Sequence, residues 1–525
     1  MHDDLQSTRQ MEMDKCFNDG QIPCRWVLDM GYGYGYPLFN YYPPLPYYLG
    51  QIFRFVGFSY IDIVKIIGVI GFVFTAFIMY FLGREFWGRM GGLVSSTFYT
   101  YGPYHSVDFW VRGAINEFWA MAFYPAILFT SYKLIKNGKK WIPLLSLSVA
   151  GLMLSHNPML MIFFPTAVIW VLFWLWKYKS RQTVIYLGLS GVWALGLAAF
   201  FTLPVIFEQK FAHVETLTIG YFNYLAHYVS IGRMLFEVKW GYGASGLGQN
   251  DFLSFHIGYF QWIVPALIIG LIFIKKLRSQ ASLLLLLLLF MLGSMFMLHN
   301  KSTFIWQHFE PLKFLQFPWR FLSMATFYAA FLSGAIAIAF KRKALISLLL
   351  AFVVILNANY FVPRAWYSEM TDQKKFSGHS WYLLITSGIF DYLPIYAPMP
   401  PADPPGGDLN LIPMGLYKTI TKKTNLQEFE LKLPTAGTVE IQTYYFPGWK
   451  VWLNGVEQTI DPKRDPLLGR MKIDVPAGDH LLVAKFTNTP IRSIGNTLSV
   501  ISWLLIIGIG IISVWRRKSP LEMSI

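Results

Sequence analysis

The stretch KKLRSQASLLLLLLLFMLGSMFML, residues 275–298, decides the fold class of this chain. Three basic residues, Lys275, Lys276 and Arg278, stand directly before the apolar run 281–298. A run of this length approaches the roughly 20 apolar residues that a helix needs to cross a bilayer. The same alternation of a short basic connector and a long apolar run recurs along the chain. We therefore predict an α-helical polytopic membrane protein.

Apolar runs indicate about eleven membrane-spanning helices, with boundaries uncertain by about four residues. We expect them near residues 61–82, 91–102, 117–134, 141–155, 158–176, 183–206, 257–274, 281–298, 319–340, 344–361 and 495–515. The runs 91–102 and 141–155 are short for a full crossing. Without both of them, however, the basic connectors would not all fall on one side of the membrane.

Basic residues cluster in every second connector. The clusters are Arg84/Arg89, Lys133/Lys136/Lys139/Lys140, Lys177/Lys179/Arg181, Lys275/Lys276/Arg278, Lys341/Arg342/Lys343 and Arg516/Arg517/Lys518. Because cytoplasmic loops carry an excess of Lys and Arg, we place all six in the cytoplasm, including the C-terminal tail, and the chain in the cytoplasmic membrane. This placement accounts for the formal net charge of +15, so nucleic-acid binding is not expected. With 54% hydrophobic and 14% charged residues, the chain is too apolar for a soluble enzyme of this size.

This topology leaves three polar segments outside the membrane: 1–58, the loop 207–256 and 362–494. They flank a multispanning domain, 59–361, and a final helix with its basic tail, 495–525. Within the third segment, residues 415–486 alternate apolar and polar side chains between turn signals such as Asn454-Gly455. We predict a small, sandwich-like extracytoplasmic β-domain there, with strands near 439–445, 450–453, 471–475 and 480–486.

The first segment, 1–58, carries an amphipathic stretch at residues 5–17 but no signal peptide. We expect that one upstream membrane helix is missing from the sequence; the alternative is that the first span alone exports the segment. Cys16 and Cys24 are the only cysteines and both lie on the outer side, so a disulfide between them is allowed, although nothing requires it.

The same segment contains GYGYGYPLFNYYPPLPYY, residues 31–48. One interpretation is an interfacial belt, in which tyrosine rings lie at headgroup level. The strict glycine alternation and the Pro43-Pro44 pair favour another, because irregular backbone at membrane depth survives only where it lines a protein cavity. Such a cavity, bordered by Tyr41 and Tyr42, would suit a lipid-linked substrate.

Two polar constellations carry the candidate chemistry. Asp3 and Asp4 stand side by side and could hold a hard divalent cation or supply a base, or they could simply form a solvated helix start. Arg112 and Glu117 stand at the mouth of a span with Asp108 nearby. They either lock one another structurally or offer a guanidinium fork to a phosphate. The polar residues His156 and Arg320 are predicted on the same outer face, so together these residues indicate a site.

Several motifs resemble a known bacterial membrane-protein family. They are 35–45 (GYPLFNYYPPL), 111–114 (VRGA) with Glu117, 155–157 (SHN), 317–320 (FPWR), and 446–449 (FPGW) with Asn454-Gly455. Together they are similar to the 6-pyruvoyl-tetrahydropterin synthase-related family, which looks like a branch of the multispanning GT-C glycosyltransferases. The family label does not describe the chemistry, because the chain shows no His-rich zinc signature.

The resemblance implies a transferase that moves a sugar from a polyprenyl-phosphate donor to a glycan or protein acceptor in the envelope. It assigns Asp3 or Asp4 as base or metal ligand, with a divalent cation as the one candidate cofactor. Arg112 or Arg320 would hold the donor phosphate, with His156 as a polar partner. The chain departs from GT-C enzymes in lacking the membrane helix that precedes their acidic loop. The alternatives are a noncatalytic envelope protein that binds glycan or lipid, and a transporter or flippase.

Overall fold

The computed structural model describes residues 2–246 and 252–518, with side chains described to residue 512 except at 389 and 390. The chain folds into two compact units. Unit 1 comprises Met1–Gln6, Asp62–Gly191 and Leu217–Glu369, and unit 2 comprises Ser7–Ile61, Val192–Thr216 and Met370–Ile525. The predicted basic cluster 516–518 lies outside the residues whose side chains are described.

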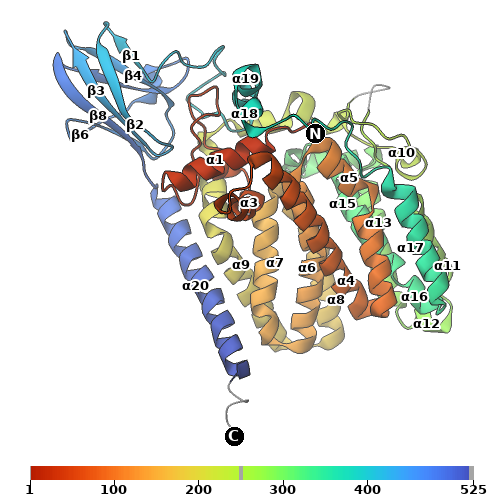
Figure 1. The fold of residues 1–525 in the computed structure, drawn as a ribbon. Helices are drawn as coiled ribbons and strands as arrows, with labels where there is room; N and C mark the ends of the chain where they lie inside the picture. The colour runs from red at the N-terminus through yellow and green to blue at the C-terminus, as the bar shows by residue number, and fades with distance from the viewer. Residues whose placement is uncertain (1, 247–251, 519–525) are drawn as a thin grey trace. The chain divides into compact units, whose positions relative to one another are not determined.

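The predicted polytopic helical fold is confirmed (Figure 1). Within the described part of the chain, six helices are long and apolar enough to cross a membrane. They are Tyr60–Thr100 (α4), Ile115–Asn137 (α6), Asn157–Tyr178 (α8), Arg181–Phe211 (α9 and the turn after it), Pro318–Ala339 (which contains α15, Leu322–Ser333, and α16, Ile336–Ala339) and Pro490–Ile512 in α20 (Pro490–Lys518).

Helix α4 contains both of the first two predicted spans, because the chain reverses within it. Gly88 has a non-helical backbone (φ 76°, ψ −179°). On either side of it the two arms run together: the Ser96 hydroxyl donates to the Ala76 carbonyl over 2.8 Å, and a Cβ on Gly83 would lie 2.8 Å from the Ser95 Cβ. The two arms form a tight helical hairpin that needs glycine both for its turn and for its close packing.

Four other predicted spans form helices of 12 to 17 residues, shorter than the six above. They are α7 (Ile142–Ser155), α11 (Tyr259–Gly270), α13 (Ala281–Met297) and α17 (Lys343–Ala358). The helix in the predicted span 257–274 is shorter than the span: α11 has 12 residues, and Ile272 and Ile274 bond three residues back in tighter turns. The chain after α13 bends by 89° into residues 300–308.

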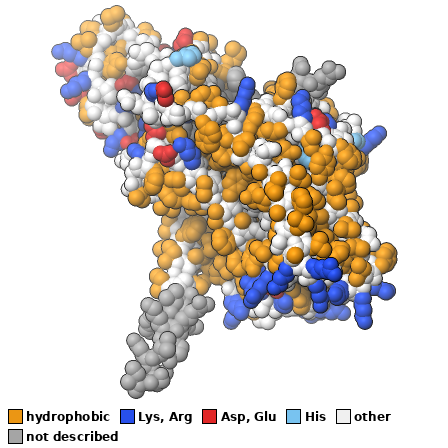
Figure 2. Space-filling view, turned by 45° about the vertical axis from the view of Figure 1, so that its right-hand side comes forward, with side chains coloured by type: hydrophobic (Ala, Val, Ile, Leu, Met, Phe, Trp, Pro, Cys, Tyr) orange, Lys and Arg blue, Asp and Glu red, His pale blue; other side chains and the backbone are white. Residues whose placement is uncertain are grey.

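The basic connectors of unit 1 meet at one end of its helices. Glu85, beside the α4 reversal, accepts from Lys133 (2.9 Å) and Lys136 (3.2 Å) at the end of α6. Lys177 at the end of α8 donates to Ser282 at the start of α13 over 3.0 Å. Figure 2 shows Lys and Arg side chains gathered along one edge of the helical region, beside an extensive hydrophobic surface. That this edge is cytoplasmic stays a prediction from the positive-inside rule.

The predicted β-region belongs to unit 2 and contains two antiparallel sheets. One has the order β1-β4-β7 and the other β2-β3-β8-β5-β6. The strands are β1 Leu409–Ile412, β2 Leu416–Lys422, β3 Leu426–Leu433, β4 Gly437–Tyr444, β5 Trp449–Leu453, β6 Val456–Gln458, β7 Arg470–Val475 and β8 Gly478–Phe486. The four predicted strands are confirmed as β4, β5, β7 and β8, and Asn454-Gly455 is the turn between β5 and β6. Alternate side chains of β3 and β7 face the shared core, as period-two strands require.

The glycine alternation of residues 31–35 serves the packing of this core. Gly31, Gly33 and Gly35 all have φ near 70–80°, and a Cβ on Gly35 would lie 2.5 Å from the indole nitrogen of Trp26. The resulting loop places Tyr34 and Tyr41 in the hydrophobic core together with residues of the β-strands. The interpretation as an interfacial tyrosine belt is therefore wrong for these two side chains, because they are buried in protein.

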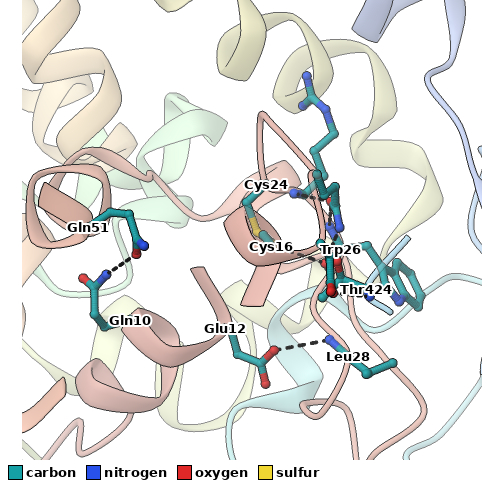
Figure 3. The surroundings of a disulfide bond; sticks show 11 residues. Gln10, Glu12, Cys16, Cys24, Trp26, Leu28, Gln51 and Thr424 are labelled. Atoms are coloured by element: carbon teal, nitrogen blue, oxygen red, sulfur yellow. Dashed lines mark hydrogen bonds between the residues drawn. A yellow bond between two sulfur atoms is a disulfide. The ribbon is translucent and has the colours of Figure 1, made fainter. Parts of the chain in front are cut away.

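Helix α1 (Gln6–Asn18) is polar and nevertheless almost wholly buried, so the predicted amphipathic helix is wrong. Several of its side chains form hydrogen bonds with partners far away in the sequence. Gln10 donates to Gln51, and Glu12 accepts from the Leu28 amide, each over 3.3 Å (Figure 3). Figure 3 also shows the disulfide between Cys16 and Cys24, which the sequence allowed without requiring. It ties α1 to the segment that carries Trp26.

Candidate functional site

The site in unit 1 is built on an irregular turn before α6. Helix α5 (Pro103–Ser106) continues into a π-helix, Val107–Arg112, which ends at Gly113 in a left-handed conformation (φ 69°). The wider π turn places Asp108 and Arg112 on one side. Short π-helical segments are frequent at functional sites, because they reorient side chains at the expense of regular hydrogen bonding.

Arg112 and Arg320 converge on the carboxylate of Glu117. The Arg112 Nη1 lies 2.8 Å from Glu117 Oε2 and also donates to Asp108, while the Arg320 Nε lies 3.1 Å from the same Oε2. The Tyr104 hydroxyl donates to the other oxygen, Oε1, over 2.5 Å. The structure thus brings together Arg112, Glu117 and Arg320, three of the predicted substrate-binding residues.

Aromatic rings hold both guanidinium groups. Arg112 lies over the Trp319 ring, 4.5 Å from its centroid, and Arg320 lies over Phe317 at 5.0 Å. The Trp319 indole donates in turn to the Ser245 hydroxyl over 3.2 Å, which connects the loop 217–246 to the cluster. Stacking fixes the guanidinium plane, so the cluster is rigid before any ligand arrives.

His156 stands beside this cluster as the N-cap of α8. Its Nδ1 accepts from the Met159 amide over 3.3 Å, which identifies the tautomer with the proton on Nε2. Burial and the charge of Arg320 lower the pKa of His156 to about 3. The imidazole is therefore neutral near pH 7 and can serve as a polar contact without adding charge.

The charge of the cluster depends on Asp108. Burial raises the pKa of this carboxyl well above its usual range and the charge of Glu117 adds to the effect, while Arg112 opposes it. Burial alone would lower the pKa of Arg112, but Glu117 and Asp108 outweigh it, so the guanidinium stays charged. Whenever Asp108 keeps its proton, the two guanidinium groups exceed the remaining carboxylate by one positive charge.

The acidic pair lies against the same turn. The amides of His2 and Asp3 donate to the carbonyls of Val111 and Arg112, each over 2.8 Å. The Gln6 side chain donates both to the Gly113 carbonyl (2.6 Å) and to the Asp3 carboxylate (2.9 Å). Asp3 is partly exposed and Asp4 is exposed. These bonds place the predicted catalytic residues beside the backbone of Arg112.

The cluster occupies the end of the helices opposite the basic connectors. Helix α6 begins two residues before Glu117 and runs 23 residues to the end that carries Lys133 and Lys136, about 34 Å away. His156 and Arg320 likewise stand where their helices begin, with Lys177 in the last turn of α8 and Lys341 just beyond the end of Pro318–Ala339. If the basic end is cytoplasmic, the cluster lies at the outer face.

Tyr41 and Tyr42 belong to unit 2, whereas the residues of this cluster belong to unit 1. The Tyr41 hydroxyl donates to the Glu208 carbonyl over 2.6 Å and the ring stacks on Tyr392. The Tyr42 ring lies under the Arg9 guanidinium, which is 4.4 Å from the centroid. Their predicted role in substrate binding stays a prediction, and in the structure Tyr41 serves the core of unit 2.

The acidic pair does not by itself form a metal site. No group of three or more His, Cys, Asp or Glu side chains among the described residues could hold a metal ion. Two carboxylates supply fewer ligands than a protein-held Ca²⁺ takes. Mg²⁺, by contrast, is commonly bound by one or two carboxylates together with substrate phosphates, so the divalent cation stays a prediction.

Gln6, Tyr104 and Trp319 were not predicted as site residues, although Tyr104 and Trp319 lie in motifs that the sequence singles out. Gln6 bridges the N-terminal segment to Gly113, Tyr104 donates to Glu117, and Trp319 supports Arg112. Trp319 is adjacent to the predicted Arg320, so its place was accessible from the sequence. Nothing in the sequence pairs Gln6 with a residue 107 positions away.

Comparison with known proteins now assigns a family. Residues 39–363, more than half of the chain, match the family model described as a 6-pyruvoyl-tetrahydropterin synthase related domain, a membrane protein. An uncharacterized protein of Lactococcus lactis subsp. cremoris (strain MG1363) is 24% identical over 253 residues, which cover 45% of this chain and 41% of that protein. No solved structure matches the chain. The chain therefore belongs to the 6-pyruvoyl-tetrahydropterin synthase related family of membrane proteins.

Proposed function

We propose that this membrane protein transfers a sugar from a polyprenyl-phosphate donor to an acceptor at the outer face of the cytoplasmic membrane, as GT-C glycosyltransferases do. One observation carries the proposal. Backbone hydrogen bonds from His2 and Asp3 hold the N-terminal segment that carries the acidic pair against a guanidinium cluster, at the end of the spans opposite the basic connectors. A base beside a phosphate-binding group is the arrangement that such a transfer needs.

Arg112 is the residue that we expect to bind the donor phosphate. Its side chain is 12% exposed, whereas Glu117 and Asp108 are fully buried, so Arg112 is the most exposed of these three side chains. A planar guanidinium matches two phosphate oxygens at once. Arg320, 8% exposed and joined to Glu117, reinforces the local positive charge.

Asp3 or Asp4 would accept the proton of the acceptor hydroxyl. The acceptor oxygen forms a bond to the anomeric carbon as the bond from that carbon to the phosphate oxygen breaks. The polyprenyl phosphate leaves with the electron pair, and the proton passes to the carboxylate. General-base catalysis of this kind contributes about 10²–10⁴-fold to the rate.

The test is transfer of radiolabelled sugar from polyprenyl-phosphate donors in membranes that contain the chain. Asp3→Asn and Asp4→Asn are compared with Asp62→Asn, a control in an exposed ion pair with Lys65 that contributes little to stability. We expect one of the first two changes to lower transfer about 10²–10⁴-fold at unchanged folded yield. The control should retain full transfer.

Undiminished transfer by Asp3→Asn, Asp4→Asn and their double variant would overturn the assignment of the base. If the folded wild-type chain transfers no sugar from any donor, the noncatalytic binding protein becomes the better description. Uptake of the donor into the opposite leaflet without transfer would instead favour a flippase.

A further inference from the structure

The β-region of unit 2 contains a hollow that the transferase chemistry does not use. Its volume is about 590 Å³, within the roughly 300–1,000 Å³ typical of ligand sites. Aromatic and polar side chains line it together with the Pro- and Gly-rich segment 401–407. The side chains that matter here are Tyr34, Asp403, Asn410, Tyr417, Gln442 and Arg470.

The polar groups of the hollow are held in place before any ligand binds. Arg470 donates to Asp465 (2.5 Å) and to the Gln442 carbonyl oxygen (2.8 Å), and its Nη2 lies 3.2 Å from Glu440. The Asn410 amide nitrogen donates to Glu440 over 2.9 Å. These bonds use one end of each side-chain amide, so the Gln442 nitrogen and the Asn410 oxygen remain to meet a ligand as donor and acceptor.

Two tyrosines contribute aromatic faces to the lining, which also contains Leu409, Leu467 and Leu468. Tyr34 packs on Tyr444 with ring centroids 5.3 Å apart, and its carbonyl accepts from the Tyr444 amide over 3.0 Å. Tyr417 is 37% exposed, and its hydroxyl accepts from the Asp408 amide over 3.1 Å. The rim is equally fixed, since a Cβ on Gly33 would lie 3.3 Å from Pro405.

The charges of this lining select the ligand class. Asp403 and Arg470 are the charged side chains among the lining residues, and Arg470 is already paired with Asp465 and Glu440, so the lining carries no excess of positive charge. Such a site does not concentrate phosphate or other anions. Aromatic faces beside paired amide, carboxylate and guanidinium groups suit a neutral ligand with apolar C–H faces and many hydroxyl groups, each of which both donates and accepts.

We propose that this hollow binds a neutral oligosaccharide. Its role as the acceptor subsite rests on the proposed transferase function, whereas the binding itself does not. The proposal names the acceptor class as glycan, which the ionic cluster of unit 1 leaves open between glycan and protein.

The experiment measures binding of the full chain, in lipid nanodiscs and without any donor, to panels of neutral, acidic and phosphorylated oligosaccharides. Asp403→Ala and Asn410→Ala test the hollow. Both residues are exposed, so neither change removes a buried group. Asp479→Ala is the matched control, an exposed aspartate on the other sheet that borders a different hollow.

We expect retention of at least one neutral oligosaccharide, weakened about tenfold by each hollow variant and unchanged by Asp479→Ala. Binding of acidic or phosphorylated glycans only, equal binding by all variants, or no retention by the wild type would overturn the proposal. Because no donor is present, failure here leaves sugar transfer untouched, and loss of transfer by the acidic-pair variants leaves this binding untouched.

Discussion

Each unit contains a buried carboxylate–guanidinium cluster, and the two differ in how completely they are closed. In unit 2, Glu208 is 2% exposed and Arg492 is fully buried. The Glu208 carboxylate accepts from Arg492 (2.9 Å), Asn40 (3.0 Å) and Thr489 (2.6 Å). In unit 1, Glu117 is equally buried, but Arg112 beside it is 12% exposed.

The difference teaches that a buried ion pair alone does not identify a site. The unit 2 cluster joins α9 to α20, and both members of its ion pair are buried, which is the pattern of a structural lock. The unit 1 cluster has a second carboxylate, a partly exposed arginine and the N-terminal segment that carries the acidic pair bonded to its backbone. Exposure of one charged member separates a candidate binding site from a lock.

The largest expected effect is loss of the lock. Glu208→Ala leaves Arg492 buried without its counter-charge, and we expect the free energy of unfolding to fall by about 3–5 kcal/mol. Denaturant titration of the detergent-solubilised chain measures it. Glu237→Ala is the control, because Glu237 is 39% exposed in its pair with Arg233 and should cost well under 1 kcal/mol. Equal losses in both variants would erase the distinction between the clusters.

A paired substitution sharpens the comparison further. Arg112→Lys keeps the charge but loses the planar fork, so we expect about tenfold weaker donor binding with little change in stability. Arg492→Lys should do the reverse, lowering stability while the folded fraction binds donor normally. Donor affinity and unfolding free energy are measured for both. Unaltered donor affinity in Arg112→Lys would contradict a phosphate role for Arg112.

The smallest expected effect concerns His105, which is fully buried in unit 1 between the aromatic rings of Tyr99 and Phe118. Burial lowers the pKa of His105 to about 3. An unfolded chain, with a histidine pKa near 6.5, binds more protons below that pH, so stability falls as the pH drops from about 6.5 toward 3.

Between pH 7 and 5.5 this effect amounts to about 1 kcal/mol for one histidine. His105→Phe should remove it, so that the variant loses less stability on acidification than the wild type does. Unfolding titrations at both pH values measure the difference. Parallel losses in the two proteins would show that His105 is not the titrating group.

The membrane fold could be predicted because its signals are local. Long apolar runs predict which segments lie in the membrane, and basic connectors predict which loops lie in the cytoplasm. Alternating apolar and polar side chains in 437–486 predict a half-buried sheet. Arg112, Glu117, His156 and Arg320 were accessible for the same reason, since polar residues at the mouths of spans are costly unless they are paired or functional. The length of α11 and the reversal at Gly88 depend on local backbone geometry that hydropathy does not report.

The sequence by itself determined the membrane class, the positions of the apolar helices, the β-region and the polar residues at the helix mouths, because each follows from neighbours along the chain. Only the tertiary structure decided which of these residues meet. Arg320 reaches Glu117 across 203 positions, and the glycine run packs against β-strands some 400 residues away. Several side chains of the buried polar helix α1 likewise form hydrogen bonds with partners far away in the sequence. Such pairings form only when segments far apart in the sequence pack together, and no local sequence pattern predicts that packing.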